Sequence, residues 1–436
     1  MKCPICESRH LKEDYLHFKH EKIDYILVKC FECECIFYLN DVDFDFKNNF
    51  EHNRNLRLYL EKTADAESLI TVVHNLFYQL PDSLNKGIDI GCGVGLIMDF
   101  AEKEFGKDIY GFEPSLHYSN EAKDLLNLNI VQDFFSATLV NEKVDFVFCF
   151  QVLQMIREPQ KLLLDIKEIL NSNGILLLST PDNQVILPEN KLAENFPILS
   201  PGVHKIIFSE KSLKIILKNC GFPFTQIFKS HNQYYILASF TEVGPIDILW
   251  PDRNVVLKYY KNKLESLSER SSYFKGVWYR YYRNLIDHGE YDEALELLKQ
   301  TKWFEIWTEK DINQISHIDK LFELNSFADA IIYYYTGILF LNNLHKPIYA
   351  EKFFQLSFLL CKKLLALQPG MCAIEEDIIW LAKLHVIISK IYNGKVEEGK
   401  TEIIYFLAFN NLNEEILPKI PLDLIKRAES IRKNIS

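Results

Sequence analysis

The stretch "GIDIGCGVGLIMDF", residues Gly87–Phe100, combines an apolar run, an acid and three glycines at every second position. A loop between a strand and a helix offers free backbone N–H groups and the positive end of the helix dipole. Glycines let a ligand approach the backbone closely and permit positive φ angles. The stretch therefore predicts a turn that meets an anionic or dinucleotide-like ligand.

Short apolar runs alternate with helical segments on both sides of this loop. The runs are nearly continuous in Val, Ile, Leu and Phe, which is typical of parallel strands covered on both faces. Alternating strands and helices predict a doubly wound α/β sheet with right-handed crossovers. The expected strands are 87–91, 108–114, 129–133, 144–150 and 174–181, and the expected helices are 66–80, 96–105, 115–127, 159–171 and 209–222. Two further runs, 224–230 and 233–240, predict an antiparallel hairpin at the sheet edge.

The bulk composition limits the classes of function. At 436 residues the chain is too long for one compact core, so two or three domains are expected. The net charge of -11 argues against a nucleic-acid partner, because phosphate neutralisation needs clustered Lys and Arg. The sequence contains no run of about 18 apolar residues, so no membrane span is expected. The N-terminus "MKCPICESRH" lacks an apolar signal core, which predicts a cytoplasmic protein.

The order of residues in the glycine loop narrows the choice of ligand. An acid, Asp89, precedes a G-x-G-x-G pattern, and an acid there suits a ligand with a cationic ammonium better than a pyrophosphate. At this point the chain resembles the class I S-adenosylmethionine-dependent methyltransferases, whose first motif reads much like "LDIGCGTG". The resemblance implies that the chain binds S-adenosylmethionine through one group of loop residues: Asp89, Gly91, Cys92, Gly93 and Gly95.

Further acids and aromatics follow the next strands. Glu113 lies 18 residues beyond Gly95, and a carboxylate at that strand end can accept both ribose hydroxyls. Asp133 is expected to accept the adenine amino group, with Phe134 packing on the ring, and Phe150 is expected to border the cofactor as well. The alternative for the acids is that they are ordinary solvated residues at strand ends.

The fourth strand leads into a motif that departs from the family. Many small-molecule and sugar methyltransferases carry "VLEHVxDP" here, whereas this chain has "VLQMIREP", so Gln154 and Met155 replace a Glu-His pair. The later stretch "HKIIFSEKSLKIILKNCGF" matches the family's "HxxxFSxxSLxxLLxxxGF". We therefore expect His204 to act as the base, since histidine is suited to take a proton near neutral pH. The alternative is that His204 only fixes its loop by hydrogen bonds.

Five of the ten cysteines fall within the first 35 residues. Two C-x2-C pairs, formed by Cys3, Cys6, Cys30 and Cys33, flank a predicted hairpin and predict a closed, structural Zn²⁺ site. The pattern resembles the zinc ribbon of some sugar and polysaccharide-associated methyltransferases. That ribbon commonly reads "CxxCG", but here Glu34 stands in place of the glycine, at a cost of about 1 kcal/mol if the position needs positive φ. Cys35 is expected to be a spare core thiol.

Residues 254–436 contain few strand signals and several helical ones. Paired helices are expected at 279–300, 330–364 and 381–407, and their pattern resembles tetratricopeptide-type repeats, with an ordinary helical bundle as the alternative. The expected organisation is a zinc ribbon (1–40), a linker (41–65), a methyltransferase domain (66–243) and a helical domain (250–436).

Taken together, the resemblance implies methyl transfer to a sugar, glycan or related small molecule, on oxygen or carbon. A second hypothesis is an inactive cofactor-binding scaffold that recruits a protein partner through the helical domain, which the Gln154-Met155 departure favours. A third is an RNA methyltransferase with a zinc module, which the acidic balance disfavours.

Overall fold

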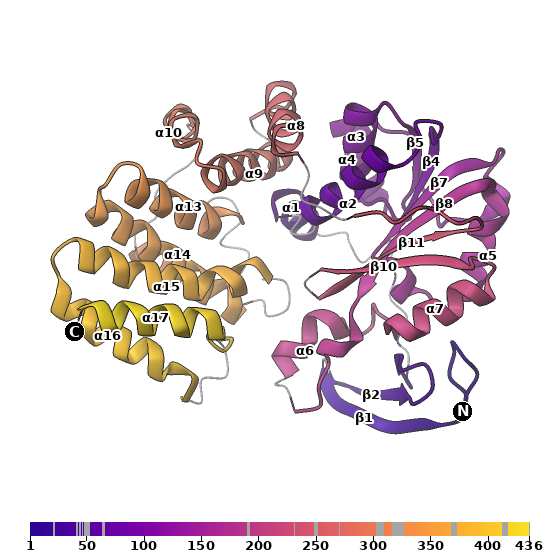
Figure 1. Cartoon of the computed structure of the whole chain (residues 1–436), viewed down its shortest axis with the longest axis horizontal. Coiled ribbons are helices and arrows are strands. Elements are labelled where there is room, and N and C mark those ends of the chain that lie inside the picture. The colour runs from indigo at the N-terminus through magenta and orange to yellow at the C-terminus, as the bar shows by residue number, and fades with distance from the viewer. Residues whose placement is uncertain are drawn as a thin grey trace. The chain divides into compact units, whose positions relative to one another are not determined.

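The computed structural model describes residues 1–20, 22–40, 42, 45, 47, 53–62, 66–189, 192–230, 232–247, 252–269, 271–301, 309–315, 327–367, 373–411 and 417–435. The chain divides into two compact units (Figure 1). The first unit consists of residues 1–56 and 65–259, and the second consists of residues 57–64 and 260–436. We call them the sheet unit and the helical unit.

A seven-stranded sheet forms the centre of the sheet unit, in the order β10-β11-β8-β7-β4-β5-β6. Its strands are β4 (Lys86–Ile90), β5 (Asp108–Phe112), β6 (Ile130–Val131), β7 (Val144–Phe150), β8 (Leu170–Pro181), β10 (Phe224–Ser230) and β11 (Gln233–Ser239). The strands from β6 to β8 are parallel, and β11 pairs antiparallel with both β8 and β10. The predicted doubly wound sheet with an antiparallel edge hairpin is confirmed.

Helices cover both faces of this sheet. They are α2 (Ala66–Gln79), α3 (Leu96–Phe105), α4 (Leu116–Leu126), α5 (Pro159–Ile169) and α7 (Glu210–Asn219). Helix α6 (Leu192–Leu199) instead packs its Ile198 and Leu199 with residues of the N-terminal region. Figure 1 shows α2, α3 and α4 on one side of the sheet and α5 and α7 on the other. Local signals begin these helices: Ser115 caps α4, Pro159 opens α5, and Ser209 forms a capping box with Ser212 at α7.

A second, smaller sheet contains the N-terminal residues. It consists of β1 (Leu11–His20), β2 (Ile23–Cys30), β3 (Ile36–Tyr38) and β9 (Ile206–Ile207), all antiparallel. The hairpin expected between the cysteine pairs is therefore present as β1 and β2. Its completion by β9, a strand from the segment before α7, was not predicted. This strand makes the N-terminal region part of the sheet unit rather than an appendage.

Part of the expected linker is helical. Helix α1 (Asn53–Lys62) lies within residues 41–65, and its Leu56 and Leu60 are buried, one turn apart. Apart from residues 42, 45 and 47, the rest of this range lies outside the described residues. The polar, Asn-rich composition indicated only a linker, but two apolar residues one turn apart form the buried side of a short helix.

The helical unit confirms the expected helices but not a repeat family. It contains α8 (Arg253–Ser266, shared with the sheet unit), α9 (Ser272–Asp287), α10 (Tyr291–Gln300), α11 (Glu309–Gln314), α13 (Asp329–Asn342), α14 (Pro347–Leu367), α15 (Ala373–Tyr392), α16 (Val396–Ala408) and α17 (Leu422–Ile435). The tetratricopeptide-like character stays a prediction.

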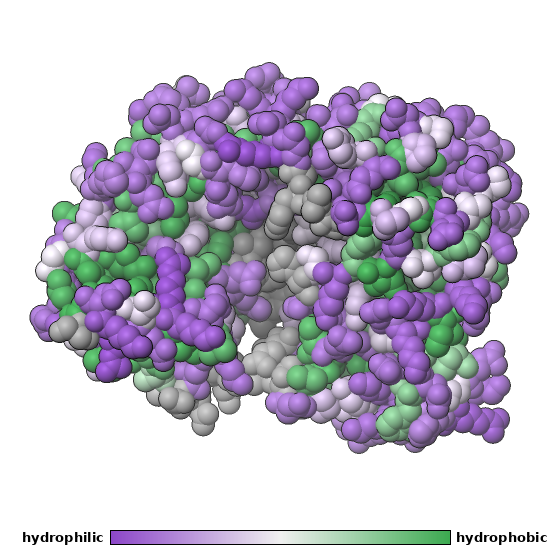
Figure 2. All heavy atoms as spheres, in the orientation of Figure 1, coloured by the Kyte–Doolittle hydropathy of each residue, from purple (hydrophilic) through white to green (hydrophobic). Residues whose placement is uncertain are grey.

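The surface of the helical unit mixes polar and apolar residues. Figure 2 shows hydrophobic residues at the surface over the region of α15 to α17, and the exposed apolar side chains there include Ile404 and Leu422. None of the helices within the described residues is both long enough and apolar enough to span a membrane.

Candidate cofactor and metal sites

The glycine loop joins β4 to α3 and is held by the neighbouring strand. The backbone N–H groups of Gly91 and Cys92 donate to the carbonyl oxygen of Phe112, at 2.8 and 3.2 Å. Gly91, Gly93 and Gly95 have φ angles of 71°, 57° and 75°, in the left-handed region that favours glycine. A Cβ on Gly91 would also lie 2.5 Å from Cγ2 of Val152. Position 91 therefore requires glycine for two reasons: its positive φ angle, and the lack of room for a Cβ atom beside Val152.

Glu113 meets this loop from the end of β5. Its Oε2 accepts a hydrogen bond from the Gly93 N–H at 3.0 Å, and its Oε1 accepts one from the Ser115 N–H at 2.8 Å. Burial raises the pKa of Glu113 to about 7, although both backbone hydrogen bonds favour the ionised form. Glu113 and the glycine loop, predicted separately, thus lie in direct contact.

Asp89 lies inside β4 and is buried. Burial, and secondly the nearby charge of Glu113, raise its pKa well above the usual range of a carboxyl group. Two buried carboxyl groups therefore stand near each other at the ends of β4 and β5. Such a pair suits a ligand that brings hydroxyl donors and a positive charge, because that ligand would compensate both carboxylates.

Asp133 and Phe134 follow β6 on the surface. The Nζ of Lys47 lies 3.0 Å from Oδ1 of Asp133 and 5.3 Å from the centroid of the Phe134 ring. This ion pair lowers the pKa of Asp133. The acid and the ring are side by side, as an adenine site would require, and their role toward a cofactor stays a prediction. The contact of Lys47 with both of them was not predicted.

Cys92 and Phe150 lie in the packed interior. A Cβ on Gly111 would approach the Sγ of Cys92 to 2.4 Å, so this thiol packs on the neighbouring strand β5. The ring of Phe150 stacks on that of Phe148 with centroids 5.3 Å apart. Both residues are buried, and packing explains their positions without a ligand.

The turn after β7 contains polar residues that the sequence did not single out. Gln151 has a φ angle of 56°, an uncommon conformation for a residue with a side chain. Its Nε2 lies 3.2 Å from both Ser179 Oγ and Gln233 Oε1, and its Oε1 accepts a hydrogen bond from Gln154 Nε2 at 2.9 Å. The only sequence signal was the position of Gln151, directly before the "VLQM" motif.

Gln154 is the first residue of the departure from the family motif, and its side chain is fully buried. Its Oε1 accepts no hydrogen bond from the described part of the chain, whereas its backbone carbonyl accepts one from the Lys205 N–H at 2.7 Å. The backbone of residue 154, whatever its side chain, therefore joins the turn after β7 to the segment that carries His204.

His204 lies between α6 and β9 and is buried. Its Nδ1 donates a hydrogen bond to the carbonyl oxygen of Ile198 at 2.7 Å, which leaves Nε2 as the ring's acceptor. Burial lowers the pKa of His204 to about 4, so the ring is neutral at pH 7. A pKa of about 4 makes His204 a weak base near pH 7, so its burial and its bond to Ile198 fit a residue that fixes the loop better than a base.

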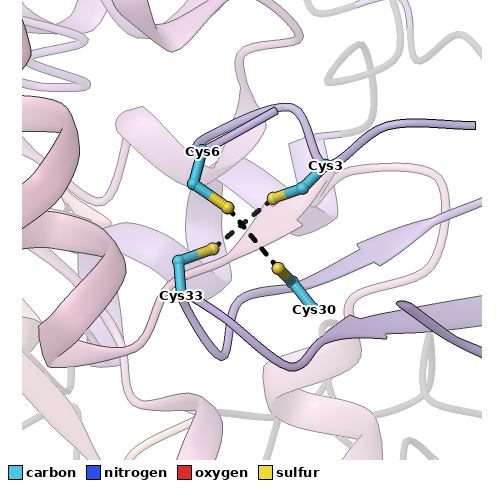
Figure 3. Close-up of side chains that lie close together, drawn as sticks. All are labelled: Cys3, Cys6, Cys30 and Cys33. Atoms are coloured by element: carbon cyan, nitrogen blue, oxygen red, sulfur yellow. Dashed lines mark hydrogen bonds between the residues drawn. The ribbon is translucent and has the colours of Figure 1, made fainter. Parts of the chain in front are cut away.

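The two cysteine pairs converge (Figure 3). The Sγ atoms of Cys3, Cys6, Cys30 and Cys33 all lie within 4.8 Å of one another. Two sulfur pairs, Cys3 with Cys33 and Cys6 with Cys30, are 3.4 and 3.5 Å apart. Four thiolates around a tetrahedral Zn²⁺ would stand about 3.8 Å apart, given Zn–S bonds of about 2.3 Å. The donor set therefore fits the metal that the sequence predicted.

Each cysteine pair is followed by a glutamate in the same turn. The Glu7 N–H donates to the Cys3 carbonyl and the Glu34 N–H donates to the Cys30 carbonyl, both at 3.0 Å. The φ angles of Glu7 and Glu34 are 58° and 64°, so the position after each pair does need the left-handed region. The Sγ of Cys35 lies 3.5 Å from those of Cys3 and Cys33, closer to the site than a spare core thiol need be.

Sequence comparison matches part of the chain, most of it in the sheet unit, to known proteins. Residues 59–227 match the sequence model of a family described as a methyltransferase domain. The tRNA U34 carboxymethyltransferase of Campylobacter jejuni is 32% identical over 123 residues, which cover 25% of this chain and 41% of that protein. The chain thus spans less than half the length of the curated relatives that it matches.

Solved methyltransferase structures also resemble part of the chain. The magnesium protoporphyrin IX methyltransferase of Synechocystis, solved with bound S-adenosylhomocysteine, matches with a TM-score of 0.33 and 19% identity over 44% of this chain and 94% of that one. A possible histamine N-methyltransferase of Thermotoga maritima matches with a TM-score of 0.34 and 17% identity, over 43% and 95% of the two chains. The match to the family model is confined to residues 59–227 of the 436-residue chain.

Proposed function

We propose that this protein is an S-adenosylmethionine-dependent methyltransferase whose cofactor lies on the glycine loop. The contact of Glu113 with the Gly93 N–H is the observation that carries this proposal, because it joins the two predicted cofactor motifs at the ends of β4 and β5. The match of residues 59–227 to a methyltransferase domain supports it independently. The two buried carboxyl groups there, Asp89 and Glu113, also fit a ligand with hydroxyl and ammonium groups.

Each residue of the proposed cofactor and acceptor sites has a defined role in this proposal. Glu113 accepts the ribose hydroxyls, Asp89 balances the ammonium charge, and the glycines keep the surface of the loop free of side chains. Asp133 and Phe134 hold the adenine. When bound, the cofactor supplies an electrophilic methyl group, and the chain contributes mainly by positioning the acceptor, which can supply several kcal/mol. His204 is the proposed base for a hydroxyl or carbon acceptor.

The four-cysteine cluster has a structural task in the same proposal. Cys3, Cys6, Cys30 and Cys33 hold one Zn²⁺. Because all four positions of the metal are taken by thiolates, the site is closed to substrate, and its contribution is to the stability of the small sheet.

The acceptor is proposed from two opposing arguments. The sequence resemblance favours a sugar, glycan or related small molecule as the acceptor. The chain's negative net charge disfavours nucleic acid as the acceptor. The curated relatives are named as tRNA-modifying enzymes, which favours tRNA as the second candidate, although the matched region is short. The inactive scaffold with a protein partner on its helical domain is the alternative if no acceptor is found.

Binding of the cofactor is tested by calorimetry on the full, metal-loaded chain. The native protein should bind S-adenosylhomocysteine, and Gly93→Arg should weaken binding by at least about a hundredfold, because its side chain would fill the cofactor site. Gly244→Arg is the matched control, since Gly244 has open space around it and should leave affinity unchanged. Tight binding of NAD, with no affinity for the methyl donor, would refute the assignment.

The acceptor is then sought with the labelled methyl donor. Total tRNA is offered in one set of reactions, and nucleotide sugars and glycans in another. Mass spectrometry of the product identifies the acceptor and the atom that carries the labelled methyl group. Cofactor binding without turnover on any acceptor would favour the scaffold.

A further inference from the structure

The N-terminal cysteine site is hydrogen-bonded to the segment that carries His204, the proposed base. We define the acceptor-side segment as residues 183–189 and 192–209, between β8 and α7. This segment contains α6, His204 and β9, and its Lys205 N–H is hydrogen-bonded to Gln154 in the turn after β7. The side chain of Val152 in the same turn packs directly on Gly91 of the glycine loop.

The second cysteine pair is hydrogen-bonded to both ends of this segment. At the start of α7, Ser209 Oγ donates to the Cys33 carbonyl at 2.6 Å. After β8, Asn183 Nδ2 donates to the Glu34 carbonyl at 2.5 Å. Both acceptors belong to the turn that carries Cys30 and Cys33, two of the four proposed metal ligands. The segment is therefore held at its two ends by the backbone of the metal turn.

The small sheet holds the middle of the segment as well. Two buried tyrosine hydroxyls donate to it: Tyr15 to the Ile186 carbonyl at 3.0 Å, and Tyr38 to the Leu199 carbonyl at 2.8 Å. Strand β3 also pairs with β9, with Ile36 opposite Ile207. Each of these bonds places a different part of the segment against the N-terminal region.

Two buried clusters continue these contacts. One face of the small sheet shares an apolar cluster with the segment, and its members are Tyr15, Phe18, Tyr25, Leu27, Ile36, Tyr38, Ile186, Ile198, Leu199 and Ile207. The cysteines share another cluster with Phe208 of the segment and Leu213 of α7, and this cluster also includes Ile90 of β4 and Phe112 of β5. A region of about 40 residues cannot bury enough apolar surface to fold alone and commonly needs a metal. The segment thus packs on the small sheet, whose neighbouring turns carry the four proposed metal ligands.

We infer that the metal held by Cys3, Cys6, Cys30 and Cys33 fixes the conformation of the acceptor-side segment, and that the small sheet transmits this effect. The hydrogen bonds described above between Glu113, Phe112 and the glycine loop lie within β4, β5 and the turns after them, and none of these bonds involves the small sheet. Loss of the metal should therefore loosen the acceptor side while the cofactor side persists. The inference rests on the proposed function for the identity of the two sides.

Hydrogen–deuterium exchange on the full chain tests this coupling, with zinc bound and after its removal by a chelator. In the metal-free protein, peptides from 183–189 and 192–209 should exchange at least about tenfold faster, as a locally opened region does. Peptides from 87–96 and 108–115 should keep their rates and their protection by S-adenosylhomocysteine, whose Kd should change less than about threefold. Unchanged exchange in the segment would overturn the inference. A rise throughout the main sheet, with loss of cofactor binding, would overturn it as well.

A variant with the metal still bound separates the coupling from metal loss itself. The double substitution Tyr15→Phe with Tyr38→Phe removes both hydroxyl donors and leaves all four cysteines in place. It should retain about one zinc per chain and still show faster exchange in the segment. Tyr281→Phe, which removes a hydroxyl bond to Glu293 in the helical unit, is the control and should leave the segment unchanged. Unchanged exchange in the double variant would mean that the tyrosines transmit nothing.

If zinc-loaded protein fails to bind S-adenosylhomocysteine, the proposed function fails. The exchange of the segment with and without zinc still decides whether the metal controls its conformation.

Discussion

The cofactor side and the acceptor side of the main sheet are built in opposite ways. The bond between Gly93 and Glu113 joins residues 20 apart in the sequence, within one strand–helix–strand unit. The bonds from Tyr15 and Tyr38 to the acceptor-side segment join residues 171 and 161 apart. The cofactor side can form when its strand–helix–strand unit folds. By the inference above, the acceptor side also requires the N-terminal region to be folded with its metal bound.

The largest test of this contrast is the loss of a metal ligand. Structural zinc binds to zinc-finger peptides with a free energy of about 10–16 kcal/mol. Removal of one of the four thiolates should therefore release most of the bound zinc. We expect Cys3→Ser to reduce zinc, measured by elemental analysis, from about one equivalent per chain to a small fraction. Cys35→Ser should retain it, because Cys35 lies near only two of the four sulfurs. Equal losses in both variants would mean that the ligand set is wrong.

The second test addresses His204, on the acceptor side. Loss of a general base typically lowers the rate about a hundredfold to ten-thousandfold. We expect His204→Ala to lose turnover to this extent, measured on the acceptor found by the transfer assay, and to keep its affinity for S-adenosylhomocysteine.

His204→Asn sharpens this experiment, because an asparagine amide can still donate to the Ile198 carbonyl but cannot take a proton. If His204 is the base, His204→Asn should turn over as slowly as His204→Ala. Recovery of the parent's turnover would assign His204 to fixing the loop instead.

The third test concerns protonation on the cofactor side. The pKa of Glu113 is raised to about 7 by burial, so its carboxyl group becomes protonated as the pH falls through 7. Ribose hydroxyls donate to the ionised form, and affinity should therefore be highest above pH 7. We expect S-adenosylhomocysteine to bind about threefold to tenfold more weakly at pH 6 than at pH 8.

Two variants check the source of this pH dependence by calorimetry. Glu113→Gln should bind weakly with a flat pH profile, since its side chain does not titrate. Glu121→Gln, on α4, is the control and should follow the parent's profile. A steep profile in Glu113→Gln would assign the titration to another group, with Asp89 the nearest candidate.

The smallest expected effect is on stability, from the turn that contains Cys30, Cys33 and Glu34. Glu34 has a φ angle of 64°, which costs about 1 kcal/mol for a residue with a Cβ. Glu34→Gly should raise the free energy of unfolding of the zinc-loaded protein by about 0.5–1 kcal/mol, measured by thermal unfolding. Glu32→Gly, within the same turn but without a positive φ, should lower it by a similar amount. A loss of stability in Glu34→Gly would show that the glutamate side chain matters more than its backbone.

The sequence predicted the elements of the main sheet closely. The expected strand 144–150 and helix 96–105 have the observed bounds of β7 and α3. These segments carry their own signals: a continuous apolar run in the strand, and Gly95 and Gly106 at the two ends of the helix. The edge hairpin was also predictable, because two apolar runs with a short polar turn can pair only antiparallel.

Other features could not be predicted because they depend on distant partners. Strand β9 has two residues and becomes a strand only by pairing with β3. Gln151 carries no motif, and its polar contacts are with Ser179 and Gln233, on other strands. The position of Lys47 beside Asp133 depends likewise on a polar stretch whose sequence indicated only a linker.

What the sequence determined by itself was local: the alternation of strands and helices, the glycines of the cofactor loop, and two cysteine pairs whose spacing suits a metal. These features follow from backbone conformation and from ligand spacing within a few residues. Only the tertiary structure decided that the cysteine site and the acceptor-side segment form one body. The physical reason is that strand pairing and burial join residues without regard to their separation, and a pattern read along the chain cannot contain that information.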